Sequence, residues 1–328
     1  MKKNIKISVL GAGLWGSVLA HYLSRGRREV WLWEFSAEAA DALKRSRRHP
    51  HIPEFKLDGA VRVTSSLAEA ALDADVLLFV LPSQFVRSTA KALAPFLRGQ
   101  RPIIVSASKG IEPKTLKTMG EIIASEVPAL AARVYTFSGP SFAREVARGV
   151  PTKMVFAGRP GPEAEKARRL FDEGAIRAQW SADRKGVELG GSLKNVLAIG
   201  CGVLDGLKAG ANTKAALIIQ GMAEMGSLIE RCGGKAETIY GLAGLGDLIA
   251  TGTSAESRNR AFGEKLGQGK SFKQAMREIP TVVEGAEAAI SAHEICRKMR
   301  LKAPLLEAIW KVVHDGASAE LVVEALGF

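Results

Sequence analysis

Residues 5–16 read Ile5-Lys-Ile-Ser-Val-Leu-Gly-Ala-Gly-Leu-Trp-Gly16, and this stretch decides the fold of the chain. An apolar run leads into Gly11, Gly13 and Gly16, and an amphipathic stretch covers Trp15 to Leu23. This order predicts a strand, a tight turn and the N-terminus of a helix. In a dinucleotide-binding turn of this kind, the first glycine permits the bend, the second leaves room for the pyrophosphate, and the third lets helix and strand pack closely. A glycine turn in another kind of α/β protein is the alternative at this point.

Short apolar runs with the length of strands recur after this unit. The run Ala74 to Leu81 is continuously apolar, which is typical of a parallel strand covered by helices on both faces. A helix is expected at Ser36–Lys44, a proline-broken loop at Arg47–Pro53, and another helix that opens at Ser83. The pattern predicts a Rossmann-type fold with a doubly wound parallel sheet. The predicted later strands are Glu29–Trp33, Val61–Thr64, Ala74–Leu81, Ile103–Ser106, Val134–Phe137, Met154–Ala157 and Ile176–Gln179.

The character of the sequence changes near Ser181, where β-branched runs give way to long helical patterns rich in Ala, Gly and Leu. A chain of 328 residues exceeds the usual size of one core, so two domains are expected. We predict a dinucleotide-binding domain at residues 1–182 and a mostly α-helical substrate and catalytic domain at residues 183–328. Gly186–Leu207 is predicted to be one long helix, in which the glycines indicate close helix packing or close approach to a ligand. A second helix is expected at Ala215–Ile229.

Composition narrows the classes of function. Lys and Arg number 46 against 34 Asp and Glu, and the formal net charge of +12 attracts anions of any kind. The basic residues are scattered apart from Arg45, Arg47 and Arg48, and no basic run is interleaved with aromatic residues, so we expect no nucleic-acid partner. The 3 cysteines are widely spaced, which predicts a reducing, cytoplasmic environment and neither a disulfide framework nor a metal site. We expect no apolar span of about 18 residues and therefore no membrane insertion.

Three segments bring cations or small polar residues to places where the ends of elements are expected to converge. They are Lys109, the loop Ser138–Ser141, and the pair Lys194-Asn195. Lys194 lies in the middle of a largely apolar helix, where burial of an unpaired ammonium is costly. A desolvated lysine has a pKa lowered toward neutrality, which suits proton exchange with a carbonyl or alcohol oxygen during hydride transfer. The alternative is an exposed lysine whose ammonium reaches water.

A second constellation combines glycines, a carboxylate, hydroxyls and an Arg-Asn pair. Arg258, Asn259 and nearby hydroxyls are suited to surround a compact phosphate dianion, while Asp247 orients a neighbouring group. A helix N-terminus near Ser257 would add a favourable dipole. The alternative is Ser254 or Ser257 as a plain helix cap with Arg258 on the surface. The segments are Gly241-Leu-Ala-Gly-Leu-Gly-Asp-Leu-Ile-Ala-Thr251 and Thr253-Ser-Ala-Glu-Ser-Arg-Asn-Arg260.

Together these segments resemble the NAD(P)-dependent glycerol-3-phosphate dehydrogenases of the bacterial type, and the resemblance runs over nearly the whole chain. The segment around Lys194 and the later Gly-Leu-Gly-Asp and Arg-Asn-Arg segments are highly specific for that family. The matching segments are, in order, Gly11–Gly16, Leu81–Gln84, Ser108–Glu112, Ser138–Ala143, Val187–Ala198, Gly206–Thr213, Gly241–Asp247, Ser257–Arg260 and Val283–Gly285.

The resemblance implies that the protein interconverts dihydroxyacetone phosphate and sn-glycerol 3-phosphate by hydride transfer with NAD(P)H, for glycerophospholipid synthesis. It implies that Lys194 is the general acid and base and that Lys109 contacts both substrate and cofactor. Combined with the reasoning above, it predicts substrate contacts at Lys109, Gly139, Ser141, Lys194, Asn195, Asp247, Ser257, Arg258 and Asn259. The predicted dinucleotide contacts are Gly11, Gly13, Leu14, Trp15, Gly16, Glu34, Lys109, Ala143, Arg258, Val282 and Glu284.

Two positions depart from the pattern of that family. Leu14 stands where relatives often have Ser, which removes one hydroxyl but leaves the backbone donors of the turn. Glu34 follows Trp33, where many relatives that use NADPH have a basic or neutral residue. A carboxylate there accepts hydrogen bonds from an adenosine ribose and repels a 2′-phosphate, so we predict a preference for NAD over NADP. Folding back of the arginines at positions 45, 47 and 48 would offset this repulsion.

Two other readings stay open from the sequence alone. A β-hydroxyacid or ketopantoate-type dehydrogenase shares the Rossmann domain and a helix-borne lysine, but it must bind a carboxylate and has less use for the Ser257–Arg260 cluster. A non-catalytic dinucleotide sensor or nucleic-acid-binding protein is the reading from another class, motivated by the net charge. A homodimer is compatible with the sequence.

Overall fold

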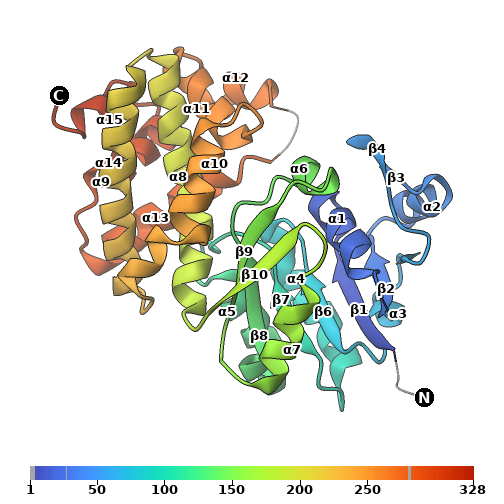
Figure 1. The fold of residues 1–328 in the computed structure, drawn as a ribbon. Coiled ribbons are helices and arrows are strands. Elements are labelled where there is room, and N and C mark those ends of the chain that lie inside the picture. The colour runs from blue at the N-terminus through green and yellow to red at the C-terminus, as the bar shows by residue number, and fades with distance from the viewer. Residues whose placement is uncertain (1–3, 27, 280–281) are drawn as a thin grey trace. The chain divides into compact units, whose positions relative to one another are not determined.

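The structure is a computed structural model that describes residues 4–26, 28–279 and 282–328, and its chain divides into two compact units (Figure 1). The first unit comprises the chain up to Ser108 together with Met119–Arg184. The second comprises Lys109–Thr118 and Lys185–Phe328. The short segment Lys109–Thr118 therefore clusters with the second unit, although it lies in the middle of the predicted first domain. A boundary between folding domains near residue 182 stays a prediction.

The first unit is built on an 8-stranded sheet with the order β10-β9-β8-β7-β6-β1-β2-β5. Every neighbouring pair is parallel except β8 and β9, so the sheet is mostly parallel and not wholly so. The connection between β8 and β9 contains only the short helix α6 (Ala143–Ala147), which is too short to carry the chain back along the sheet. The strands are β1 (Ile5–Leu10), β2 (Arg28–Trp33), β5 (Arg62–Thr64), β6 (Val76–Phe79), β7 (Ile103–Ser106), β8 (Val134–Ser138), β9 (Thr152–Ala157) and β10 (Ile176–Ser181).

Helices cover both faces of this sheet, because successive side chains of a strand point to opposite faces. Ile7 and Val9 of β1 pack in one core cluster with buried residues of α1, α2, α6 and α7. Leu10 and Phe79 pack in a second cluster with buried residues of α3, α4 and α5. The predicted doubly wound, Rossmann-type fold is confirmed. The helices of this unit are α1 (Leu14–Leu23), α2 (Ala37–Ser46), α3 (Leu67–Ala71), α4 (Ser83–Leu93), η1 (Ala94–Leu97), α5 (Met119–Glu126), η2 (Pro128–Arg133), α6 and α7 (Pro162–Leu170).

The segment predicted to be a proline-broken loop contains a small antiparallel hairpin instead. Its strands are β3 (Arg48–His49) and β4 (Ile52–Lys56), and Pro53 lies within β4. A two-stranded sheet has open edges on both sides, so a residue without an N–H group is tolerated there. The prediction of a loop at this place is wrong for that reason.

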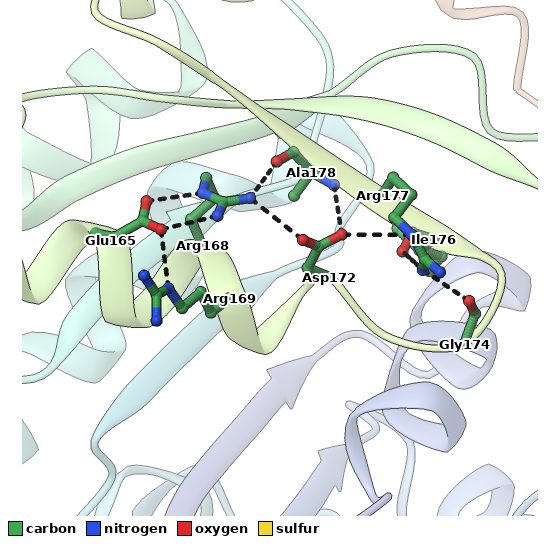
Figure 2. A network of polar contacts seen from close by, with 8 residues as sticks. All are labelled: Glu165, Arg168, Arg169, Asp172, Gly174, Ile176, Arg177 and Ala178. Atoms are coloured by element: carbon green, nitrogen blue, oxygen red, sulfur yellow. Dashed lines mark hydrogen bonds and ion pairs between the residues drawn. The ribbon is translucent and has the colours of Figure 1, made fainter.

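Strand β10 lies at the edge of the large sheet, and side chains cover its outer backbone groups (Figure 2). The carbonyl of Ala178 accepts a hydrogen bond from Arg168, and its N–H donates to Asp172. Arg168 is held in turn by both carboxylate oxygens of Glu165. An edge covered in this way is poorly available for pairing with another strand.

The second unit is helical and has a core cluster of its own. Helix α8 (Arg184–Gly206) is buried at every residue from 186 to 204, as expected of a helix enclosed by others. Among the described residues, α8 alone is long and apolar enough to cross a membrane, so the expectation of no such apolar span is wrong. The whole apolar window of α8 is buried in the fold. The other helices are α9 (Gly210–Arg231), η3 (Ala236–Tyr240), η4 (Leu242–Gly246), α10 (Asp247–Thr253), α11 (Arg258–Gly267), α12 (Phe272–Arg277), α13 (Glu284–Met299), α14 (Pro304–Trp310), η5 (Lys311–Asp315) and α15 (Leu321–Glu324).

The glycines of α8 mark close contacts with its neighbours. A Cβ atom on Gly202 would lie 1.9 Å from the carbonyl oxygen of Arg260 on α11. In the other direction, a Cβ atom on Gly263 of α11 would lie 2.0 Å from the carbonyl oxygen of Ile199. No side chain fits between the two helices at these points, so their backbones pack directly against each other.

Candidate active site

The glycine turn lies where the strand order of the first unit reverses, between β1 and β6. Open α/β sheets bind ligands at such a point. Gly11 has φ +114°, and a Cβ atom there would lie 2.3 Å from the carbonyl oxygen of Val80. A Cβ atom on Gly16 would lie 1.9 Å from the carbonyl oxygen of Gly11, whereas one on Gly13 would meet nothing within 4 Å. The first and third glycines are therefore needed for the turn itself, and the space at the second is open.

Helix α1 begins directly after this turn. Gly13 is its N-cap residue, and no side chain caps its first N–H groups. The first turn also contains no acidic residue, and it opens with Leu14 and Trp15. Uncapped amides and the positive end of the helix dipole make this a suitable place for a pyrophosphate.

Glu34 lies beside the same turn. The N–H of Gly11 donates to the carbonyl of Trp33 at 3.0 Å, which ties the turn to the end of β2. The Glu34 carboxylate accepts a hydrogen bond from the N–H of Ser36 at 3.2 Å. Two of the arginines that could offset its charge are engaged elsewhere, because Arg47 donates to the carbonyls of Asp58 and Val61 and Arg48 donates to that of Pro53.

The loop after β8 supplies the remaining predicted residues of the first unit. Gly139 has φ +138°, a conformation that favours glycine. The hydroxyl of Ser141 donates to the Gly139 carbonyl at 3.2 Å. Ala143 is the first residue of α6. These three residues lie at the carboxyl end of β8, the edge of the sheet at which ligands bind.

Lys194 is the centre of a buried polar cluster in the second unit. Only 5 % of the residue is exposed, and Asp247 is 3 % exposed. The Nζ atom of Lys194 donates to Oδ1 of Asp247 at 3.0 Å and to Oγ1 of Thr251 at 2.5 Å. Lys109 Nζ donates to the other oxygen of the same carboxylate at 2.6 Å. The alternative of an exposed lysine at position 194 is wrong, because α8 is enclosed and its ammonium is paired.

Burial sets the protonation chemistry of this cluster. It lowers the pKa of Lys194 from its usual 10.5 to about 8, although the Asp247 carboxylate opposes the shift. The positive charge of Lys109 lowers the pKa of Lys194 further, and the carboxylate of Glu284 raises it. Burial acts to raise the pKa of Asp247, but the two ammonium groups outweigh it and hold that pKa below its usual value. A lysine of this kind changes its charge near neutral pH, as proton exchange requires.

The segment that carries Lys109 is fixed to α8. The N–H of Gly110 donates to the hydroxyl of Ser192 at 2.9 Å, and Thr118 donates to the carboxylate of Glu188. The hydroxyl of Ser192 itself donates to the carbonyl of Glu188. The part of α8 that precedes Lys194 therefore holds Lys109, the second lysine of the cluster, in place.

The Ser257–Asn259 segment begins helix α11. Ser257 is its N-cap and accepts from the N–H of Arg260, while Arg258 is exposed. This is the arrangement that the alternative reading predicts, yet the Ser257 hydroxyl keeps its proton to donate. Asn259 is buried, donates to the side-chain oxygen of Asn195 at 2.9 Å, and accepts from the N–H of Gly285 at 3.0 Å. Asn195 and Asn259, which are both predicted substrate contacts, are thus hydrogen-bonded to each other.

The remaining predicted residues lie at the start of α13. Glu284 is the first residue of this helix, and Val282 precedes it with 44 % of its surface exposed. Glu284 is electrostatically coupled to Lys194. Val282, Glu284, Lys109 and Arg258 belong to the second unit, whereas the other predicted dinucleotide contacts belong to the first.

Thr251 and Ser192 are the residues that the sequence reasoning missed. Thr251 follows Asp247 by four residues on α10, so both side chains lie on one face of that helix and reach the same ammonium. The four-residue spacing of Asp247 and Thr251 was the sequence signal that could have identified Thr251. Ser192 lies two residues before Lys194, on another face of α8, and nothing in the sequence indicated its bond to Gly110.

These features define a class of protein. A Rossmann-type unit with an open glycine turn and an acidic residue after β2, joined to a helical unit with a buried lysine–aspartate–lysine cluster, is the architecture of a nicotinamide-dependent dehydrogenase.

Comparison with known proteins identifies the family. Residues 6–162 match the family model "NAD-dependent glycerol-3-phosphate dehydrogenase N-terminus", and residues 183–324 match the corresponding C-terminus. Glycerol-3-phosphate dehydrogenase [NAD(P)+] 2 of Lactobacillus delbrueckii subsp. bulgaricus is 43% identical over 98% of this chain and 96% of its own length. The glycerol-3-phosphate dehydrogenase [NAD(P)+] of Geobacter sulfurreducens is 42% identical with the same coverage. The crystal structure of glycerol-3-phosphate dehydrogenase from Coxiella burnetii has a TM-score of 0.91 at 32% identity and covers 98% of each chain. The chain belongs to the NAD-dependent glycerol-3-phosphate dehydrogenase family and is an enzyme of that kind.

Proposed function

We propose that this protein interconverts dihydroxyacetone phosphate and sn-glycerol 3-phosphate with a nicotinamide dinucleotide, and so supplies the glycerol backbone of phospholipids. The observation that carries the proposal is the buried Lys194 ammonium, bound to Asp247 and Thr251 in a chain whose relatives are named for this reaction. A ketone reduction needs a proton for the developing alkoxide, and a lysine with a pKa of about 8 is suited to donate it.

Each residue of the cluster has a distinct part in the proposed reaction. When bound, the nicotinamide supplies hydride to carbon 2 of the ketone. Lys194 donates a proton from Nζ to the oxygen on that carbon, and it takes the proton back in the oxidation. Lys109 adds positive charge beside the developing alkoxide, and Asp247 holds both ammonium groups in place through its two oxygens. Gly139, Ser141 and Asn195 complete the proposed substrate contacts.

The phosphate of the substrate is proposed to bind at the start of α11. Arg258 supplies charge, the Ser257 hydroxyl and Asn259 amide supply hydrogen bonds, and the N-terminus of the ten-residue helix adds its dipole. Arg258→Ala should raise the KM for dihydroxyacetone phosphate more than it changes kcat. An unchanged KM would count against phosphate binding at this place.

For the cofactor we propose NAD in preference to NADP. The support is the carboxylate of Glu34 beside the glycine turn, together with the engagement of Arg47 and Arg48 by backbone carbonyls. Gly11, Gly13, Leu14, Trp15, Gly16, Ala143, Val282 and Glu284 are proposed to line the dinucleotide with Lys109 and Arg258. The test is kcat/KM with NADH and with NADPH, and an equal or higher value with NADPH would overturn the preference.

One assay tests the proposed function directly. Oxidation of NADH is followed with dihydroxyacetone phosphate, with ketopantoate and without substrate. Turnover of dihydroxyacetone phosphate alone is expected. Turnover of ketopantoate instead would favour the ketopantoate-type alternative, and binding of NADH without any turnover would favour a dinucleotide sensor.

We propose a cytoplasmic location because Cys201, Cys232 and Cys296 all lie outside disulfides, and thiols persist in a reducing compartment. A homodimer and a boundary between folding domains near residue 182 also stay proposals. Size-exclusion chromatography with light scattering tests the first, and expression of residues 183–328 alone tests the second.

A further inference from the structure

Arg260 lies next to the proposed phosphate ligands, but its side chain is committed to other partners. Its Nε atom donates to the carbonyl of Ser254 at 3.0 Å, and its Nη1 atom donates to Oδ2 of Asp205 at 2.7 Å. The other oxygen of Asp205 accepts from Lys214 of α9. With a side chain only 15 % exposed, Arg260 forms a partly buried bridge from the loop before α11 to α8.

This bridge holds one end of the segment that carries the phosphate ligands. Ser254 is the C-cap residue of α10, and Ser257 accepts a hydrogen bond from the backbone N–H of Arg260 itself. The other end is held by the bond from Asn259 to Asn195 on α8. The positions of Ser257, Arg258 and Asn259 are therefore set by two attachments to a single helix.

Helix α8 also carries Lys194. Asp205 follows Lys194 by 11 residues, which is close to three turns, so both side chains leave the same face of the helix about 16 Å apart along its axis. The direct backbone contact at Gly202 places α11 against α8 between these two positions. The proton donor and the phosphate ligands thus share one rigid support.

We propose that Arg260, acting through Asp205, is a positioning residue that sets the distance between the phosphate-binding segment and Lys194. That the bound anion is the phosphate of the substrate rests on the proposed function. The contacts of Arg260 with Ser254 and Asp205 do not depend on it. Arg260 has its guanidinium directed to Ser254 and Asp205, so it acts on the substrate through the loop and not by contact.

The variant Asp205→Asn distinguishes positioning of the phosphate ligands from a simple effect of charge on phosphate binding. Removal of a negative charge near an anion site favours anion binding by electrostatics, so a pure charge effect would lower the KM for dihydroxyacetone phosphate. Loss of the bridge should instead raise this KM, because the phosphate ligands are no longer held in position. We expect Asp205→Asn to raise this KM about 5-fold and Arg260→Gln to raise it about 10-fold, with kcat within about 3-fold and the KM for NADH unchanged.

Glu264→Gln is the matched control. Glu264 also pairs with Arg260, at 3.2 Å, but it lies within α11 and does not reach the loop. Its loss removes the same charge as Asp205→Asn and leaves the bridge intact, so KM should stay near that of the wild type. The double variant of Arg260 and Asp205 should be no worse than Arg260→Gln alone, because both changes break the same bridge.

Binding of inorganic phosphate to the full chain, measured by calorimetry, makes the test independent of catalysis. Weaker phosphate binding in Arg260→Gln and Asp205→Asn, but not in Glu264→Gln, supports positioning even if the wild type does not turn over dihydroxyacetone phosphate. If the wild type turns over this substrate but both variants keep its KM and phosphate affinity, the inference is overturned. A fall in kcat and melting temperature with KM unchanged, which a merely structural role predicts, also overturns it.

Discussion

Asp247→Asn and Lys109→Gln should move the pKa of Lys194 in opposite directions. Lys194 Nζ lies 3.0 Å from one oxygen of Asp247, and Lys109 Nζ lies 2.6 Å from the other. The carboxylate favours the charged form of Lys194, whereas the ammonium of Lys109 disfavours it. Loss of the carboxylate should therefore lower the pKa of Lys194 below about 8, and loss of Lys109 should raise it.

Coulomb's law bounds the size of these shifts. With an effective dielectric constant of about 20, unit charges about 3 Å apart interact by about 5 kcal/mol, an upper limit because the altered site relaxes and admits water. Neighbouring charges shift pKa values by about 1–3 pH units in proteins, so we expect a fall of about 2 units for Asp247→Asn. Lys109 binds the opposite oxygen and acts over a longer distance, so a rise of about 1 unit is expected for Lys109→Gln.

The assay is kcat/KM for oxidation of glycerol 3-phosphate at saturating NAD, measured from about pH 6 to about pH 10. Oxidation needs neutral Lys194 as the base, so kcat/KM rises with pH and levels off above the pKa. Reduction needs the ammonium as the acid and falls over the same range. Thr251→Val, which removes the hydrogen bonds to Lys194 and Asp247 but no charge, is the control and should shift the profile far less. Equal profiles, or shifts of both charge variants in one direction, would refute the assignment of the titrating group to Lys194.

Gly202→Ala places a methyl group 1.9 Å from the Arg260 carbonyl oxygen and should lower the free energy of unfolding by about 2 kcal/mol or more in chemical denaturation. Gly226→Ala, whose nearest contact would be at 3.6 Å, should be neutral or stabilising. Burial raises the pKa of the Cys201 and Cys296 thiols to about 12, so a thiol reagent near neutral pH should modify Cys232 first, and rapid modification of all three would contradict this. Arg168→Ala combined with Asp172→Ala uncovers the outer edge of β10 and should increase light scattering on storage with activity unchanged. Arg169→Ala, which loses only its contact with Glu165, should behave like the wild type.

The features of the first unit that follow from local sequence could be predicted. The glycine turn depends on φ at Gly11 and on close packing at Gly16, both of which are properties of a few neighbouring residues. The parallel strands were visible as apolar runs because they are buried on both faces. The direction of β9 was not, since an apolar run reads the same for a parallel and an antiparallel neighbour.

The candidate site of the second unit could be predicted only in part. Lys194 stood out because its neighbours on α8 are apolar, and Asp247 because it ends a glycine-rich run. Their pairing, the third partner Thr251 and the attachment of Lys109 to Ser192 depend on contacts between residues far apart in the chain. The same holds for Arg260, whose motif was visible but whose partner Asp205 lies 55 positions away.

The most direct test of the account is the rate of hydride transfer by Lys194→Ala. A single turnover of NADH oxidation by the variant with saturating dihydroxyacetone phosphate measures this rate without contribution from product release. Loss of the proton donor should slow it by about 100-fold or more while the affinity for NADH is kept. A rate near that of the wild type would contradict the central claim that the buried ammonium of Lys194 supplies the proton.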